Sequence, residues 1–336
     1  MQQAPLTSSE FATLWIVYEK KSMMVKVMDY FLATNQDPDA RQILQSFQQG
    51  ESSFVSEIAN LFQQEGAAVP VGFTENDVNL EAPPLFDDIF EIMYLRTMMK
   101  IASGIHSLHI SMSYREDILD LYKRFTQYAE EFCTVTTQYL LTKGVLPKSP
   151  HINSPDHVEF VKNKNYRSGF SFTKQRRSLN SVEVAYLYQA LESNVAGMKL
   201  MTGFAQVASD QDLRKYFFRG KELSKTIIKK FGNILLESDI TPPSTAAGQV
   251  TNSIMSPFSD KLMMYNTSLL SSFGLGSTTI GTSFSMRKDL PIKMLAIAKD
   301  ILEFANDGGD LMIEHQLMEE PPQFEDRTQL VKGKNR

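Results

Sequence analysis

Cysteine is almost absent from this 336-residue chain, in which Cys133 is the single example. One cysteine cannot form an internal disulfide or a thiolate zinc cluster, so the sequence favours a reducing compartment over secretion. Positive charge is not in excess either, because 34 Lys and Arg face 39 Asp and Glu and leave a net charge of −5. We therefore expect no overall attraction to nucleic acid or to an anionic membrane. The N-terminal residues lack the basic and apolar segments of a signal peptide, which favours a cytoplasmic protein.

Motifs that carry common enzyme chemistry are also missing. The chain contains no Glu-x-x-His pair, the motif that supplies ligands in di-iron helical bundles. A phosphate loop, a dinucleotide fingerprint and a nucleophile elbow are absent as well. An enzyme is therefore the less favoured class of protein.

The residues that are present indicate two folded domains. Hydrophobic residues make up 42% of the chain and charged residues 22%, which excludes a disordered or collagen-like protein. An internal repeat divides the chain, since many residues recur after a shift of 173 positions and, beyond a one-residue deletion, after 172. The first shift relates Leu14, Glu19, Met28, Phe31, Asp37 and Arg41 to Leu187, Glu192, Met201, Phe204, Asp210 and Arg214. The second relates Phe86, Asp88, Arg115 and Asp117 to Phe258, Asp260, Arg287 and Asp289.

Four long helices are predicted in each copy from apolar residues at helical spacing. In the first copy, a capping box formed by Thr7 and Glu10 predicts a helix over about 8–34. The Asp37-Pro38 pair opens a second helix, which continues to Gly66.

The second half of the copy follows the same pattern. A third helix is predicted from about Asp87 to 113, and a capping box of Ser113 and Glu116 opens a fourth that ends at Gly144. No comparable stretch alternates in the manner of a β-strand.

The lengths of the connections predict the topology. The first two helices and the last two are joined by short links, so each pair is antiparallel. The 19 residues from 66 to 84 reach ~60 Å when extended, which exceeds the ~42 Å length of a 28-residue helix. A long crossover also fits residues 239–256 of the second copy. We therefore expect an all-α protein of two tandem ferritin-like four-helix bundles, over residues 1–146 and 179–322, with a basic linker over 147–178 and a tail over 323–336.

Several segments together resemble a known family. They are PVGFTENDVN at 70–79, RKYF at 214–217, RGKE at 219–222, SPFSDKLMM at 256–264 and EPPQ at 320–323. With them the chain resembles the domain of unknown function 3231 family, a tandem of ferritin-like bundles from spore-forming bacilli, with looser similarity to ferritin-like spore coat proteins. The resemblance implies a helical fold and a place in the sporulating cell or spore, and it implies no established reaction.

A metal site is conceivable in the first copy only. Glu51 interrupts the apolar stripe of its helix, where a buried carboxylate needs a partner or a raised pKa. Glu19, Glu51, His106 and Glu130 are the candidate ligands for iron or manganese. The alternative is that Glu51 pairs with Lys20 or Lys21 and that His106 and His109 form hydrogen bonds at a helix boundary. In the second copy the third helix, over 262–286, has no carboxylate.

Cys133 is a candidate nucleophile or a packing residue. A reactive thiolate needs a nearby base or cation, and the sequence places none beside it. Its repeat-related residue is Ala305, which favours packing.

Three surface features are also present. The linker over 147–180 has a net charge of +5 with interleaved aromatic residues, and fits either a polyanion contact or a strap that docks on the bundles. An acidic stripe on the last helix fits a solvated face, a weak cation site or a place for that linker. The 25 residues from 262 to 286 carry no charge, and the repeat favours a buried or self-associating helix over a membrane span. The stripe consists of Asp300, Glu303, Asp307, Asp310 and Glu314.

Three functions fit these observations. The first is a non-enzymatic structural or interaction protein that forms a homo-oligomer or binds a protein partner, without nucleic acid, membrane span or cofactor. The second is a metal-dependent oxidase or storage protein that uses the first copy. The third is a bundle that binds an apolar ligand between helices rich in Met, since the chain has 17 methionines, and it predicts a sizeable apolar pocket within one bundle.

Overall fold

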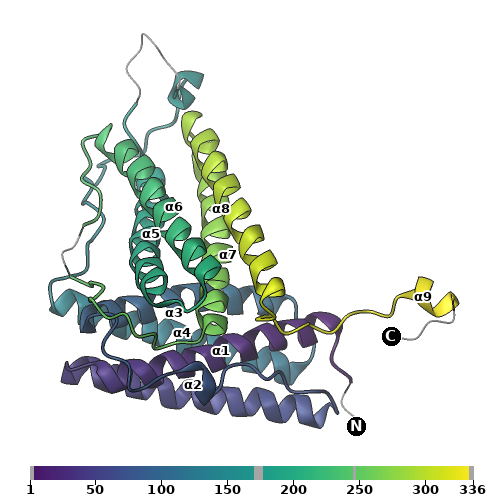
Figure 1. The fold of residues 1–336 in the computed structure, drawn as a ribbon. Coiled ribbons are helices and arrows are strands. Elements are labelled where there is room, and N and C mark those ends of the chain that lie inside the picture. The colour runs from purple at the N-terminus through teal and green to yellow at the C-terminus, as the bar shows by residue number, and fades with distance from the viewer. Residues whose placement is uncertain (1–3, 170–176, 245–246, 333–336) are drawn as a thin grey trace.

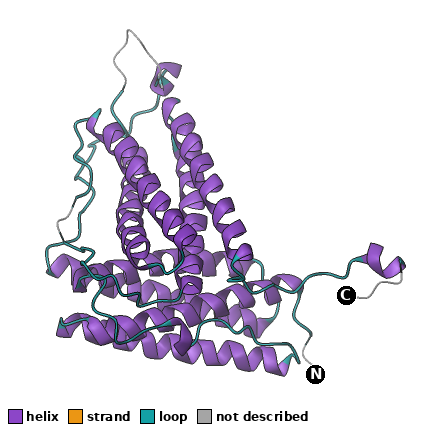
Figure 2. Ribbon diagram, viewed as in Figure 1, coloured by secondary structure: helices purple, strands orange, loops and turns teal. Residues whose placement is uncertain are grey.

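Eight long α-helices form two groups of four in the computed structural model, which describes residues 4–169, 177–244 and 247–332. We call α1 to α4 bundle 1 and α5 to α8 bundle 2. In Figure 1 the helices of bundle 1 lie alongside one another, and bundle 2 stands across them. Figure 2 shows helices and loops throughout, and the described residues contain two isolated β-bridges but no longer strand. The long helices are α1 Ser8–Thr34, α2 Pro38–Gln64, α3 Asp88–Ser111, α4 Glu116–Thr142, α5 Ser181–Val207, α6 Gln211–Leu236, α7 Asp260–Phe284 and α8 Asp289–Glu314, and the short ones are η1 Glu75–Asp77, η2 Lys164–Arg167 and α9 Arg327–Val331.

The starts of α1 and α5 follow the repeat. Thr7 and Glu10 form the predicted capping box at α1, and the observed helix has the predicted bounds. Asn180 and Glu183 form the equivalent box at α5. Polar side chains at matching positions therefore fix the first turn of both bundles.

The predicted capping box at the start of α4 is wrong. The N-cap residue is Arg115, which makes no side-chain capping bond, and the Ser113 hydroxyl instead donates to the carbonyl of His109 at 2.8 Å. The Glu10 carboxylate accepts the N–H groups of Tyr114 and Arg115, at 2.8 and 2.7 Å. The N–H groups at the start of α4 are therefore satisfied by a residue more than one hundred positions away, and local sequence does not reveal this partner.

The same long-range cap recurs in bundle 2. Glu183 accepts the N–H groups of Met286 and Arg287 at 3.1 and 2.9 Å. These residues are related by the repeat to Glu10, Tyr114 and Arg115.

The predicted long connections link α2 to α3 and α6 to α7. Consecutive helices with short links pack side by side, as expected for antiparallel pairs. The two long crossovers, residues 65–87 and 237–259, meet through the antiparallel bridges Val78 to Phe258 and Phe86 to Val250.

The 172-residue shift maps each hydrogen bond between the crossovers onto a second one, in which the donor and acceptor crossovers are reversed. The N–H of Asn79 donates to Pro257 at 2.8 Å, and the N–H of its repeat mate Thr251 donates to Leu85 at 2.9 Å. The N–H of Ser259 donates to Asp77 at 3.0 Å, and that of its mate Asp87 donates to Gln249 at 3.0 Å. The crossovers are thus arranged like the two halves of a two-fold symmetric dimer.

Three hydrophobic clusters make up the core of the described part of the chain. One contains Leu14, Phe62 and Phe125 and lies within bundle 1, and a second contains Leu187, Phe231 and Ile297 and lies within bundle 2. The largest cluster joins the bundles, since it includes residues of α1 to α8 and of both crossovers. The bundles therefore share one core rather than meeting through a polar domain interface.

Candidate functional site

The centre of bundle 1 holds a buried ion pair. Glu51 on α2 is 2% exposed, and its Oε2 lies 2.6 Å from the Nζ of Lys21 on α1. The Lys21 ammonium also lies 4.7 and 4.2 Å from the ring centroids of Phe54 and Phe125. Of the two lysines predicted as partners for Glu51, Lys21 is the one that pairs, and the aromatic faces further stabilise its charge.

Lys20 lies beside this pair without a hydrogen bond among the described residues. Its side chain is 2% exposed, and Nζ makes no such bond there. Burial, and then the charge of Lys21, lower the pKa of Lys20 to about 7. The amine is therefore largely neutral at mildly alkaline pH, which avoids a second unpaired buried charge.

His106 and His109 add two neutral bases on α3. Both are buried, and the Nδ1 of each lacks a hydrogen-bond partner in the described part of the chain, contrary to the predicted bonds at a helix boundary. Burial, and then the Lys20 charge, lower the pKa of His109 to about 4 and hold that of His106 well below its usual value. The imidazoles pack against Tyr122 and Phe125, with ring centroids 5.2 to 6.3 Å apart.

The other two predicted metal ligands point elsewhere. Glu130 is exposed on the outer face of α4. Glu19 faces bundle 2, where burial and then the Glu319 carboxylate raise its pKa to about 7. Glu19, Glu51, His106 and Glu130 are therefore not gathered at one place, and the described residues contain no group of three or more His, Cys, Asp or Glu that could hold a metal ion.

The donor set at the centre of bundle 1 does not fit a divalent cation. Iron and manganese favour several carboxylate and imidazole ligands, whereas here one carboxylate is bonded to an ammonium group and a second amine lies next to it. Like charge and the occupied carboxylate both oppose a second cation. Iron or manganese in bundle 1 stays a prediction, which elemental analysis tests.

Cys133 is half-buried and packs against the shared core. Its carbonyl accepts a hydrogen bond from the Thr136 hydroxyl at 3.2 Å. This environment suits the packing role that Ala305 suggests at the related position.

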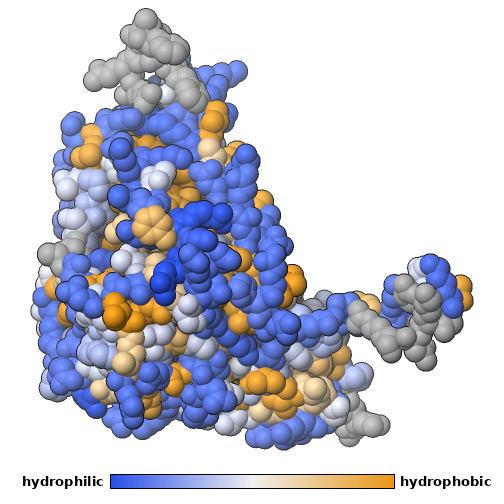
Figure 3. All heavy atoms as spheres, in the orientation of Figure 1, coloured by the Kyte–Doolittle hydropathy of each residue, from blue (hydrophilic) through white to orange (hydrophobic). Residues whose placement is uncertain are grey.

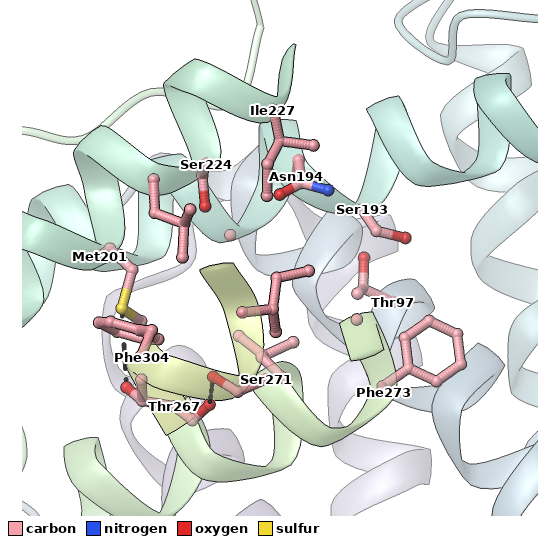
Figure 4. A pocket seen from close by; sticks show the side chains of 16 residues that line it. Thr97, Ser193, Asn194, Met201, Ser224, Ile227, Thr267, Ser271, Phe273 and Phe304 are labelled. Carbon is pink, nitrogen blue, oxygen red and sulfur yellow. Dashed lines mark hydrogen bonds between the residues drawn. The ribbon is translucent and has the colours of Figure 1, made fainter. Parts of the chain in front are cut away.

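Bundle 2 has a cavity at its centre instead of charged residues. Figure 4 shows side chains from several helices around it, with Ser193 and Asn194 from α5, Ser224 from α6 and Ser271 from α7. The repeat relates Lys20, Lys21 and Glu51 of bundle 1 to Ser193, Asn194 and Ser224 of this lining. It also relates Met24 and Phe47 to two further lining residues, Gly197 and Gly220. Smaller side chains thus replace the ion pair and leave a space of about 70 Å³.

The polar groups of the cavity mostly bond to their own helices. The Thr267 and Ser271 hydroxyls donate to the carbonyls four residues earlier at 2.8 and 2.9 Å, and the Asn194 amide donates to Ala190 at 2.8 Å. The described residues that line the cavity carry no charge. One water needs roughly 10–15 Å³, so the cavity has room for several waters or one small neutral molecule. At about 70 Å³ it is smaller than the sizeable apolar pocket that the third function predicts.

The basic linker and the acidic stripe do not meet among the described residues. Arg177 of the linker pairs with Glu183 at 2.7 Å and stacks on Tyr166. Two residues of the stripe pair instead with α6, Asp300 with Lys230 and Asp307 with Arg219, at 3.4 and 2.6 Å, and Glu303 pairs with Lys299 of α8 at 3.3 Å. Phe160 is exposed, so this aromatic residue does not dock as a strap would. Phe170, Phe172, Lys174 and Arg176 lie outside the described residues.

The uncharged segment over 262–286 lies mostly in α7, which is largely buried in its first half and exposes Ile280 and Phe284 near its end. Met263 and Asn266 are both at most 1% exposed. No helix within the described ranges combines the length and apolar character that a membrane span requires. On the face drawn in Figure 3, hydrophobic residues form separate patches among hydrophilic ones.

Comparison with known proteins gives one family and one solved structure. The sequence model of the family described as protein of unknown function (DUF3231) matches residues 1–158 and 167–330, in two tandem copies. No curated protein matches the chain. A crystal structure of a candidate spore coat protein from Bacillus halodurans aligns with a TM-score of 0.41 and 19% identity, over 45% of this chain and 98% of that one.

Proposed function

This chain belongs to the protein family of unknown function DUF3231, and we propose that it is a non-enzymatic structural or interaction protein built as a fixed pair of bundles. The observation that carries the proposal is the pairing of the two crossovers. Backbone hydrogen bonds and a common core hold the bundles across each other, as suits a protein that presents surfaces in a set geometry. The sporulating cell or spore is the setting that the family resemblance suggests.

We further propose that the bundles are ferritin-like units that arose by duplication. The equivalent long-range caps of Glu10 and Glu183 support this, as does the exchange of crossover bonds under the 172-residue shift. In this proposal the chain is a fused dimer, in which each unit covers the crossover of the other.

Calorimetry tests the fixed pairing. We expect the wild-type protein to unfold in a single transition, because the shared core couples the bundles. Asn79→Pro removes the N–H that donates to Pro257 and should separate the transitions of the two bundles. Asn79→Ala keeps this N–H and should preserve the single transition. Two transitions in the wild-type protein would overturn the proposal.

The metal-dependent alternative is tested separately. Protein purified without chelator and then incubated with iron(II) or manganese(II) should retain well below one ion per chain, because an ammonium group already neutralises Glu51. A stoichiometric metal content that Glu51→Ala abolishes would favour an oxidase or storage protein.

A second candidate function is the binding of a small neutral molecule in bundle 2. The cavity that Gly197, Gly220 and Ser224 leave at the bundle centre favours it. Isopropanol at low concentration should raise the Tm of the wild-type protein relative to Gly197→Met, which copies Met24 and fills the space. Equal shifts in both proteins would show that the cavity holds water only.

A further inference from the structure

A second pocket lies between the bundles, outside both bundle centres. Phe90, Met93 and Arg96 of α3 line one side of it, and Glu192, Val195 and Lys199 of α5 line the other. Pro147, which follows α4, and Pro243 of the second crossover complete the walls. Its volume is about 40 Å³. At roughly 10–15 Å³ for one water, this space matches about three waters or one carboxylate group with a short alkyl tail.

Cations outnumber carboxylates at this pocket. Arg96 bonds to Glu192, whose carboxylate is the only one among the described lining residues and is also contacted at 2.7 Å by Lys100 from outside the lining. Lys199 is the second lining cation, whose Nζ donates to the carbonyl of Ala247 at 2.8 Å and which Asp87 influences only at longer range. The other walls are largely apolar, so the pocket combines excess positive charge with low polarity. An anion that enters such a site interacts more strongly than it does in water.

The repeat provides a precedent for the ligand within the same molecule. The 172-residue shift relates Pro147 to Glu319, which follows α8, and relates Met93 to Tyr265. The Glu319 carboxylate occupies the corresponding place at the other end of the two-fold arrangement. It accepts the N–H groups of Val71 and Gly72, both at 2.8 Å, and the Lys261 ammonium at 3.1 Å.

The two related places therefore differ in several side chains, and above all in the source of the carboxylate. One contains a carboxylate supplied by the chain, and the other has Pro147, which supplies none, together with a pocket and an excess of cations. We propose that the pocket between α3 and α5 binds the carboxylate of a small organic acid, with Lys199 and Arg96 as its cationic partners. Acetate and propionate are the sizes that fit, and a ligand of about four heavy atoms gives affinities on the order of millimolar.

Titration calorimetry of the full chain with sodium acetate tests the proposal, against sodium chloride at matched ionic strength. Acetate should bind, whereas acetamide, which has nearly the same shape and no charge, should not. Lys199→Met should weaken acetate binding about tenfold or more. The matched control is Lys26→Met, at the repeat-related position of α1, where Lys26 pairs with Asp29 and Glu75 and binding should stay unchanged.

A gain-of-carboxylate variant provides an independent measurement. Pro147→Glu copies Glu319 and should fill the pocket from within, so that acetate binding is lost while the protein remains folded. Equal binding of acetate and acetamide, or undiminished acetate binding in both Lys199→Met and Pro147→Glu, would overturn the proposal. Binding of a Glu-Glu-Pro-Pro peptide without binding of acetate would also overturn it, because the ligand would then be a protein segment.

Discussion

Bundle 1 and bundle 2 have related backbones and differ most at their centres. At equivalent positions bundle 1 has Lys20, Lys21 and Glu51, and bundle 2 has Ser193, Asn194 and Ser224. The first set fills its space and is stabilised by one ion pair and two aromatic faces. The second leaves a cavity of about 70 Å³. The same helical frame therefore accepts either buried charge or empty space.

This comparison shows how bundle 1 tolerates buried charge at its centre. A buried pair is stable only while both partners remain, since one partner alone is an uncompensated ion in a medium of low polarity. The lowered pKa of Lys20, about 7, limits the cost further above neutral pH, because only one ammonium then needs a carboxylate. The centre of bundle 2 does not depend on a paired charge, but its cavity lowers stability because packing there is incomplete.

Removing the carboxylate at the centre of bundle 1 has the largest expected effect. Glu51→Ala leaves the Lys21 ammonium 2% exposed without its partner, and we expect a loss of about 3–5 kcal/mol in the free energy of unfolding. Urea denaturation followed by circular dichroism measures this loss.

The matched variant is Ser224→Ala at the equivalent place in bundle 2, where we expect a change below about 1 kcal/mol. Replacing both partners, by Lys21→Met with Glu51→Leu, should recover most of the loss, because two apolar side chains can be buried without a charged partner. A small effect of Glu51→Ala alone would mean that water reaches the pair.

A second contrast between the bundles lies at the corner where Glu91 is buried. The Asn35 amide and the Thr34 hydroxyl donate to its carboxyl group at 2.6 and 3.0 Å. Bundle 2 has the apolar residues Val207, Ala208 and Met263 at the equivalent positions. Burial, opposed by these two hydrogen bonds, raises the pKa of Glu91 from 4.5 to about 8.

This raised pKa predicts a loss of stability with increasing pH. Between about pH 4.5 and 8 the unfolded chain has lost the Glu91 proton and the folded chain still holds it, so the stabilisation is complete below this range and falls through it. The free energy of unfolding of the wild-type protein, relative to Glu91→Gln, should therefore fall by a few kcal/mol from pH 5 to pH 9. Glu131→Gln on the exposed face of α4 should show no such change. A constant difference for Glu91→Gln would indicate a solvated, ionised carboxylate.

The sequence predicted the helices and the repeat because both have local or periodic signals. The start of α1 follows from Thr7 and Glu10. The segment over 262–286 was expected to be buried, and this holds for the first half of α7, whereas Ile280, Phe284 and Met286 are exposed. The start of α4 was predicted wrongly, because its N–H groups are satisfied by Glu10 of another helix.

The candidate site was harder to predict than the fold. Residues 20 and 21 are adjacent, so helical periodicity did not distinguish which lysine pairs with Glu51. Glu130 was chosen by its place along α4, but it points outward. The cavity of bundle 2 left a readable signal, since glycine and serine replace Met24, Phe47 and Glu51, and aligning the two copies position by position would have found it. The pairing of the crossovers has no periodic pattern and appears only in three dimensions.

Gly203 tests the close contact between the bundles and is expected to have a smaller effect. A Cβ atom there would lie 2.7 Å from Cζ of Phe86, which is 1% exposed and stacked on Phe90 with centroids 4.3 Å apart. Gly203→Ala should destabilise the protein by about 1–2 kcal/mol, despite the better helix propensity of alanine. Urea denaturation measures the loss, and adding Phe86→Leu should recover part of it. Stabilisation by Gly203→Ala would mean that the interface repacks freely.

Substitution of Gly197, on the same helix, is expected to change the free energy of unfolding in the opposite direction and by the smallest amount. A Cβ atom added there would meet only the Ser224 hydroxyl within 4 Å, at an ordinary distance of 3.7 Å, and would point into space that bundle 1 fills with Met24. Gly197→Ala should therefore stabilise the protein by about 1 kcal/mol through helix propensity and partial filling of the cavity. The two glycines lie on α5 and undergo the same chemical change, so the difference between their urea midpoints reports local space alone. Equal destabilisation by both substitutions would show that α5 needs glycine for its backbone, and the cavity would then not explain the contrast between the two bundle centres.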